Sequence, residues 1–122
     1  MEIVKLEDYK NIYAVDPLAD EYKSLFGKSY TEYKNCLEKL KTNLSILDHE
    51  GLKKALTYQQ FEKVEGEDLY SIRYVSKSNP RVIFAYVVEG SIILLAAFKE
   101  KKKSDYQNAI NKAKDRIKEL EE

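Results

Sequence analysis

The fold is decided by residues 69–98, which read LYSIRYVSKSNPRVIFAYVVEGSIILLAAF. Runs rich in β-branched and aromatic residues alternate here with short polar breaks, a pattern typical of consecutive β-strands. We predict strands at residues 69–76, 81–89 and 91–98. Lys77-Ser78-Asn79-Pro80 is predicted to form the first turn, and Glu89-Gly90 a tight hairpin turn. Because both connections are short, the three strands should form an antiparallel meander.

Helical periodicity flanks this stretch on both sides. Before it, an apolar stripe recurs at spacings of three and four and comprises Tyr33, Cys36, Leu37, Leu40, Leu44 and Leu47. Ser29-x-x-Glu32 has the pattern of a capping box and marks the start of that helix. Asp16-Pro17 marks an earlier helix, and a short helix follows Gly51. After the meander, Ser104 or Asp105 is predicted to cap a last helix. Its stripe comprises Tyr106, Ala109, Ile110, Ala113, Ile117 and Leu120.

A short strand at residues 2–6 completes the predicted element order β-α-α-β-β-β-α. This order predicts an α+β fold in which a small antiparallel sheet packs against helices. The 122 residues suit one domain spanning 1–122, and 43% hydrophobic residues are enough for a packed core. The single cysteine, together with the lack of a leader or long apolar run, predicts a cytoplasmic location without membrane contact.

Positive charge is concentrated in the predicted sheet. The net charge is zero, which argues against a generally basic nucleic-acid coat, but residues 51–103 hold 10 Lys and Arg against 6 Asp and Glu. In an antiparallel meander, Arg81 and the lysines of 99–103 should gather at one sheet end, with Arg73 on the neighbouring strand. Such a cluster can hold an RNA phosphate. The alternative is a solvated strand end whose lysines block edge pairing.

A metal-dependent nuclease is a second chemistry to consider for the same segment. Glu100-Lys101-Lys102 follows the last predicted strand, and Glu89 lies at its other end. At roughly 3.3 Å per residue, carboxylates about 11 residues apart along a strand cannot share an ion. The sequence has no Cys/His cluster for zinc and no glycine-rich phosphate loop. We therefore expect no metal and no cofactor.

The meander resembles the HigB/RelE-type toxins, and among them the phage-associated HigB branch. The segments that carry the resemblance are Leu69-Tyr70-Ser71-Ile72-Arg73, Pro80-Arg81-Val82-Ile83-Phe84, 89–98, the lysine run, and a final helix with Ile110 and Ala113. The resemblance covers residues 63–120. It implies a RelE-like fold and the toxin of a type II toxin–antitoxin pair, with a helix-turn-helix antitoxin as partner. Most members are metal-independent mRNA endonucleases, often ribosome-bound, in which the RNA 2′-OH attacks the adjacent phosphate.

The resemblance also implies roles for individual residues. Arg73 falls on a sheet position that carries Lys or Arg, and Arg81 falls on the arginine that contacts the scissile phosphate, so we expect both to neutralise that phosphate. Tyr106 falls near a late tyrosine of RelE members, which makes it our candidate general base. The predicted phosphate-binding lysines are Lys63, Lys99, Lys101 and Lys102. We expect the Arg81 side chain to reach solvent at the mouth of its strand.

Four positions depart from the family pattern. Glu100 stands where the first lysine of a pair is expected, Ala96 and Ala97 where histidine can occur, and Ser71 where lysine can occur. These departures remove acid–base and cationic groups. The alternative function is therefore a non-catalytic or weakened RelE/ParE-fold protein that binds a partner, such as a gyrase inhibitor or a phage interaction protein.

Overall fold

The strands predicted between residues 69 and 98 form the centre of the sheet. β4 (Tyr70–Arg73), β5 (Pro80–Tyr86) and β6 (Ile92–Lys99) pair antiparallel in that order. The computed structural model describes residues 1–73 and 78–122, so part of the first predicted strand and turn lies outside the described residues. The α+β class and the antiparallel meander are confirmed.

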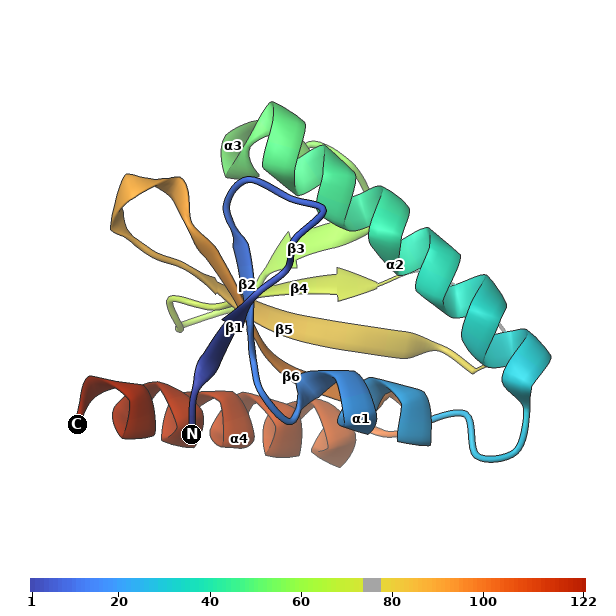
Figure 1. Cartoon of the computed structure of the whole chain (residues 1–122). Helices are drawn as coiled ribbons and strands as arrows, with labels where there is room; N and C mark the ends of the chain where they lie inside the picture. The colour runs from blue at the N-terminus through green and yellow to red at the C-terminus, as the bar shows by residue number, and fades with distance from the viewer. Residues whose placement is uncertain (74–77) are drawn as a thin grey trace.

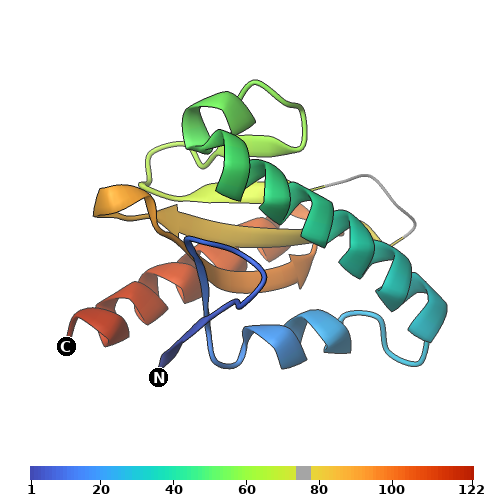
Figure 2. The ribbon, with the colours of Figure 1, turned by 45° about the horizontal axis from the view of Figure 1, so that its top comes forward.

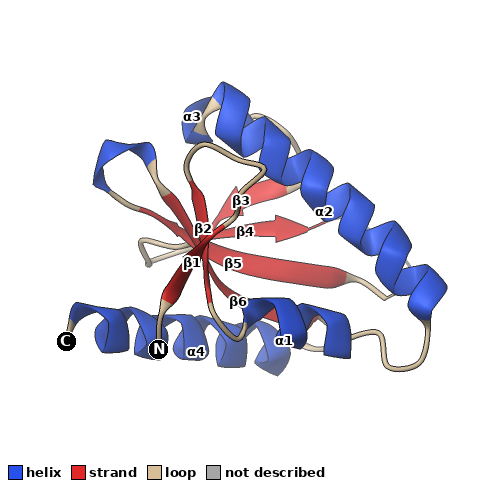
Figure 3. Ribbon diagram, in the orientation of Figure 1, coloured by secondary structure: helices blue, strands red, loops and turns tan. Residues whose placement is uncertain are grey.

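The sheet is larger than the sequence predicts. In residues 1–73 and 78–122 it has six strands, in the order β1-β2-β6-β5-β4-β3 (Figure 3). The predicted N-terminal strand is β1 (Ile3–Lys5), whereas β2 (Ile12–Val15) and β3 (Phe61–Lys63) were not predicted. β2 pairs parallel with β6 and every other pair is antiparallel. The described sheet is therefore mixed, and not wholly antiparallel as predicted.

Within the described residues four helices cover the sheet: α1 (Leu18–Ser24), α2 (Tyr30–Glu50), α3 (Leu52–Ala55) and α4 (Lys103–Glu121). Figures 1 and 2 show α2 and α4 on opposite faces, and α1 packs beside β6. Both predicted stripes face the core, because Leu40 and Leu44 of α2 and Ala109 and Ala113 of α4 are buried. No helix in the described ranges is long and apolar enough to cross a membrane.

Two predicted boundary motifs are wrong in detail. Instead of a two-residue turn, five residues connect β5 to β6, and Val88–Gly90 form a short 3₁₀ turn. Glu89 and Gly90 adopt φ angles of 81° and 87°, a left-handed conformation that glycine accommodates without strain. Ser29 does precede α2, but its side chain makes no capping hydrogen bond. The Glu32 carboxylate accepts from the Cys36 thiol, at 3.6 Å.

The start of α4 also differs from the prediction. The helix begins at Lys103, so Asp105 lies inside the first turn and does not precede it. Its carboxylate accepts the backbone N–H groups of Lys101 (2.9 Å) and Lys102 (3.0 Å). These two backbone groups hold the pKa of Asp105 below its usual range. Asp105 thereby orders the turn that joins β6 to α4.

A buried arginine fastens α4 to the rest of the molecule. Arg116 Nη1 donates to Glu21 Oε1 of α1 (2.9 Å) and to the carbonyl oxygen of Leu95 in β6 (2.8 Å). Its second terminal nitrogen contacts the other Glu21 oxygen. This arrangement, the Arg116 clamp, fixes the helix that also carries Tyr106.

Candidate functional site

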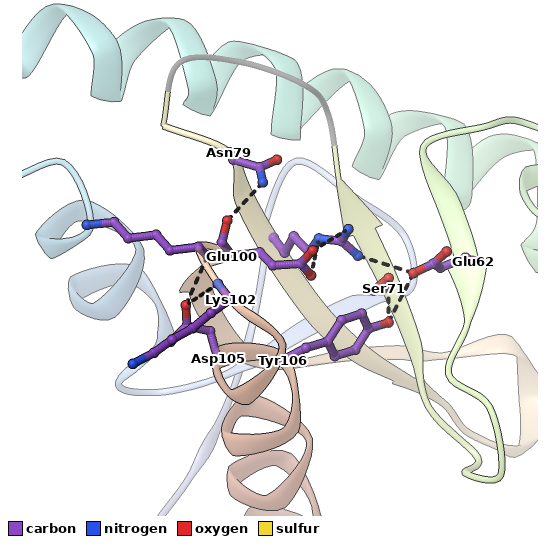
Figure 4. Close-up of polar contacts among 9 residues, drawn as sticks. Glu62, Ser71, Asn79, Glu100, Lys102, Asp105 and Tyr106 are labelled. Atoms are coloured by element: carbon purple, nitrogen blue, oxygen red, sulfur yellow. Dashed lines mark hydrogen bonds and ion pairs between the residues drawn. The ribbon is translucent and has the colours of Figure 1, made fainter.

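Five polar side chains from five segments meet at the end of the sheet where β5 begins (Figure 4). They are Glu62 of β3, Ser71 of β4, Arg81 of β5, Glu100 after β6 and Tyr106 of α4, and we call them the Arg81 cluster. Strand register brings Glu62 opposite Ser71 and Arg81 opposite Phe98. Because paired residues point to the same face, the cluster lies on the face that α4 covers.

Arg81 is buried at the centre of the cluster. Only 5% of the residue is exposed, so the prediction that its side chain reaches solvent is wrong. Its guanidinium donates to Glu62 Oε1 through Nη1 (3.1 Å) and to Glu100 Oε1 through Nη2 (3.2 Å). The guanidinium carbon also lies 5.1 Å from the centre of the Tyr106 ring. Two carboxylates and a ring face therefore take the place of water.

The pairing of Arg81 with Glu100 is close but poorly aligned. Arg81 Nε and Glu100 Oε2 lie 3.0 Å apart, yet neither atom makes a hydrogen bond of acceptable geometry. Asn79 holds this part of the chain, since its side-chain amide donates to the backbone oxygen of Glu100 (3.0 Å). An oxyanion that presented two oxygens squarely to the guanidinium would satisfy the Arg81 nitrogen that Glu100 leaves without a hydrogen bond.

Tyr106 joins the helix to the carboxylate side of the cluster. Its hydroxyl donates to Glu62 Oε1 (3.1 Å) and lies 3.3 Å from Ser71 Oγ, while its ring packs against Phe98. Burial raises the pKa of the phenol, and the negative charge of Glu62 raises it further, against the hydrogen bond with Ser71. The hydroxyl therefore stays protonated at neutral pH, which favours a proton donor over the general base that we predicted.

Arg73 lies closer to Arg81 than the sequence predicts. The two residues are direct cross-strand neighbours in the pairing of β4 with β5. Within the described residues Arg73 has no carboxylate partner, and it is only half-buried. Two adjacent arginines thus differ in state, since one is neutralised by carboxylates and the other is available to an anion.

The predicted lysines gather at this sheet end without touching Arg81. Lys101 and Lys102 are exposed in the turn that Asp105 orders. Lys99 ends β6, and its Nζ lies 5.6 Å from the centre of the Phe26 ring. Exposed ammonium groups around a buried arginine are suited to binding the phosphates that flank a central one.

A groove of about 400 Å³ runs past the cluster between β3 and the start of α4. Its lining includes Glu62, Lys63, Lys103 and Tyr106. Lys63 donates to the backbone oxygen of Glu67 (2.7 Å), so this predicted phosphate ligand lies along the groove and not at the centre of the cluster. The groove gives an extended chain direct access to Glu62 and Tyr106.

Glu62 is the member of the cluster that the sequence did not reveal. It lies in a three-residue strand without measurable alternation, next to the acidic turn 65–68. Nineteen positions separate it from Arg81, and only the strand register brings the two together. The neighbouring Lys63, which the family pattern singled out, was the available signal.

The acidic residues of the described chain do not form a metal-binding group. No set of three or more His, Cys, Asp or Glu side chains converges in residues 1–73 and 78–122. Glu89 and Glu100 flank opposite ends of β6, as the distance argument predicts. What the cluster offers chemically is a guanidinium for an anion, with a carboxylate and a phenol joined by a hydrogen bond beside it.

Comparison with known proteins shows the family of the chain. Residues 34–118 match the family described as phage derived protein Gp49-like (DUF891), a segment that contains every member of the Arg81 cluster. No curated protein matches the chain. The matched segment covers more than half of the sequence and includes the whole meander and most of α4. The chain belongs to the phage-derived Gp49-like family, which is a RelE-like toxin family.

Proposed function

We propose that the protein is the toxin of a type II toxin–antitoxin pair and cleaves mRNA in the cytoplasm without a metal ion. The observation that carries the proposal is the Arg81 cluster, in which a buried guanidinium lies beside a hydrogen-bonded carboxylate and phenol. This set matches the needs of phosphodiester transesterification, which are charge stabilisation, a base and an acid. The proposed partners are mRNA, with the ribosome as platform, and a helix-turn-helix antitoxin.

The first step is exchange of Glu100 for the scissile phosphate. Glu100 follows β6 in the turn to α4, and its side chain is 27% exposed, so it can move into solvent. One hydrogen bond, from Arg81 Nη2, holds Glu100 to the guanidinium, because its contact with Arg81 Nε is misaligned. A phosphate then receives the fork of Arg81, with the charge of Arg73 nearby. Lys63, Lys99, Lys101 and Lys102 bind the neighbouring phosphates.

The chemical step uses Glu62 and Tyr106 as a pair. Glu62 accepts the proton of the RNA 2′-OH while the 2′ oxygen bonds to phosphorus. The bond from phosphorus to the 5′ oxygen breaks, and the protonated Tyr106 gives its proton to that leaving oxygen. The products are a 2′,3′-cyclic phosphate and a 5′-hydroxyl. A proton returns from Glu62 to Tyr106 across their 3.1 Å hydrogen bond, which restores the starting state.

The test is cleavage of a defined mRNA fragment, with and without ribosomes and in the presence of a chelator. We expect 2′,3′-cyclic phosphate ends, and a rate about a hundredfold lower in Glu62→Gln. The matched control is Glu65→Gln, because Glu65 is exposed in the same groove and makes no contact with Arg81. Absence of cleavage by the unmodified chain in both conditions, or full activity of Glu62→Gln, would contradict the mechanism.

A second candidate function is favoured by one observation. Both carboxylates already neutralise Arg81, which is the state expected of a protein that no longer binds RNA and instead binds a partner. Induced expression separates the two functions. Growth arrest with mRNA cuts supports the nuclease, whereas DNA-damage signalling without cuts supports a gyrase inhibitor.

A further inference from the structure

A chain of aromatic rings lies where α1 ends and α2 begins. Tyr22 and Phe26 have ring centres 5.3 Å apart, Phe26 and Tyr33 5.8 Å, and Tyr33 and Tyr30 6.2 Å. Three of these rings are buried or half-buried, but Tyr30 at the end of the chain is 63% exposed. The buried rings therefore support one ring that faces water.

Three of these four rings each have a lysine ammonium group near the ring face. Lys34 Nζ lies 5.6 Å from the centre of the Tyr30 ring, Lys23 Nζ 5.9 Å from Tyr33, and Lys99 Nζ 5.6 Å from Phe26. None of the three forms an ion pair with a carboxylate in the described part of the chain, whereas Lys41, Lys112 and Lys114 do. We call Tyr30, Tyr33, Lys23, Lys34 and Lys99 the aromatic–lysine surface, in which the ammonium groups lie over ring faces.

This surface lies at the same end of the sheet as the Arg81 cluster but beside the opposite face, since Tyr30 and Tyr33 belong to α2. Lys99 is the last residue of β6, and the next residue is Glu100, which pairs with Arg81. In Figures 1 and 2 the turn between α1 and α2 lies at the sheet end where β6 finishes and α4 starts. A chain bound with a phosphate at Arg81 can therefore pass around this end of the sheet, by way of Lys99, toward Tyr30.

Exposed rings beside unpaired lysines are suited to one kind of ligand. Single-stranded nucleic acid presents bases that stack on aromatic side chains and phosphates that attract ammonium groups. We propose that Tyr30 stacks on a base of single-stranded RNA, a few nucleotides from the phosphate held by Arg81, with Lys34 and Lys99 on the intervening backbone. The proposal deepens the proposed function and rests on it. Tyr30 and Lys23 precede residue 34, so they lie outside the segment matched by the family.

The sequence contains no tryptophan, so a tryptophan introduced at one position reports binding at that position by its fluorescence. Tyr30→Trp keeps a stacking ring and introduces a single indole. The probe is a 12-nucleotide 2′-O-methyl single-stranded RNA, which lacks the attacking hydroxyl and is not cut. We expect quenching of the indole emission of Tyr30→Trp on titration, and an affinity close to that of the unmodified chain. Tyr30→Ala should bind the probe about tenfold more weakly.

Tyr86 provides the matched control. It is also an exposed tyrosine (46%), but it ends β5 at the opposite end of the strand from Arg81. We expect no quenching in Tyr86→Trp and unchanged affinity in Tyr86→Ala. In cleavage assays, Tyr30→Ala should raise KM about tenfold with little change in kcat, because the stacked base is remote from the reacting atoms.

The outcomes separate the two proposals. If the unmodified chain cleaves RNA but Tyr30→Ala binds and cleaves like it, the stacking surface is disproved and the nuclease stands. If RNA quenches Tyr30→Trp but not Tyr86→Trp, and no cleavage occurs, RNA stacking stands and the nuclease fails. If neither binding nor cleavage is observed, both fail. A Tyr30→Ala defect confined to binding of a purified antitoxin would overturn the RNA proposal and assign this surface to a protein.

Discussion

Two buried arginines pack against this sheet and differ in how firmly their partners are held. Arg116 is 8% exposed and Arg81 is 5% exposed, and each pairs with carboxylate oxygens. Arg116 also donates to the backbone oxygen of Leu95, so a partner that cannot move away satisfies part of its guanidinium. Arg81 is held by side chains of Glu62 and Glu100, and one of its nitrogens is left without a hydrogen bond.

The difference shows that the burial of an arginine does not by itself indicate a structural role. The Arg116 clamp ties α1, β6 and α4 together, as expected of a structural ion pair. The Arg81 partners come from a strand at the sheet edge and from a turn, and the exposed fractions of their side chains are 44% for Glu62 and 27% for Glu100. A guanidinium whose partners can leave is suited to exchange them for another anion.

The largest expected effect is on Arg81 and on catalysis. Arg81→Ala should lower RNA cleavage by about a hundredfold, because one preorganised contact to the developing charge is lost. Arg81→Lys should be impaired less, since it keeps the charge but loses the fork. Initial rates on a defined mRNA test this, with thermal melting measured in parallel. Equal rates in Arg81→Ala and the unmodified chain would remove the centre of the site.

Arg116 should show the opposite pattern. Arg116→Ala leaves Glu21 short of its main partner and the Leu95 oxygen without its donor. We expect a loss of about 2–4 kcal/mol in the free energy of unfolding, measured by urea denaturation. The cleavage rate of the folded fraction should be unchanged. A variant as stable as the parent would show that the Arg116 clamp is not structural, and the proposed difference between Arg116 and Arg81 would be wrong.

The clamp should also be sensitive to acid. Burial acts to raise the pKa of Glu21, but the hydrogen bond and charge of Arg116 outweigh it and hold the pKa below the usual 4.5. A lowered folded-state pKa gives stability that is present above the unfolded value and is lost as pH falls through the folded pKa. We expect the stability advantage over Glu21→Gln to shrink below about pH 4.5 in urea titrations.

A suitable control for the acid titration is Asp20→Asn, because Asp20 is an exposed carboxylate in the same helix without an ion pair among the described residues. It should follow the unmodified chain at every pH. If Glu21→Gln showed the same acid dependence as the parent, the loss of stability would have to be assigned to other carboxylates.

The smallest expected effect concerns Glu100. Glu100→Gln removes the charge that competes with phosphate for Arg81, so affinity for RNA should rise by roughly threefold, or about 0.6 kcal/mol. Glu119→Gln makes the same change of charge at the far end of α4 and serves as control. Binding of the 2′-O-methyl probe at fixed salt measures both. Weaker binding in Glu100→Gln would mean that Glu100 orients Arg81 and does not block it.

The meander was predictable because its signals are local. Residues 80–86 and 92–99 are dense in β-branched and aromatic side chains and are separated by turn residues. β2 and β3 have only four and three residues, too few for a period to register, and β2 gains its partner from residues 80 positions later. Ser29 and Glu32 fit a capping pattern, yet Glu32 is drawn to Cys36 instead.

The site was predictable in its cations but not in its anions. Arg81, Arg73 and Tyr106 could be placed from strand order and the family pattern, and they do gather at one sheet end. The burial of Arg81 could not be predicted, because it depends on Glu62 of β3 reaching across β4 to β5. Ion pairs between distant segments leave no periodic trace in a sequence.

The parallel pairing of β2 with β6 has a consequence for synthesis. Ile12 of β2 pairs with Ile92 of β6, and Glu21 of α1 pairs with Arg116 of α4, which is synthesised much later. Contacts this distant in the chain slow folding, since a long loop must close before they form. On the ribosome, the first strands emerge long before the segment that completes the sheet. A nascent chain therefore has no assembled Arg81 cluster until the start of α4, which carries Tyr106, has emerged from the exit tunnel.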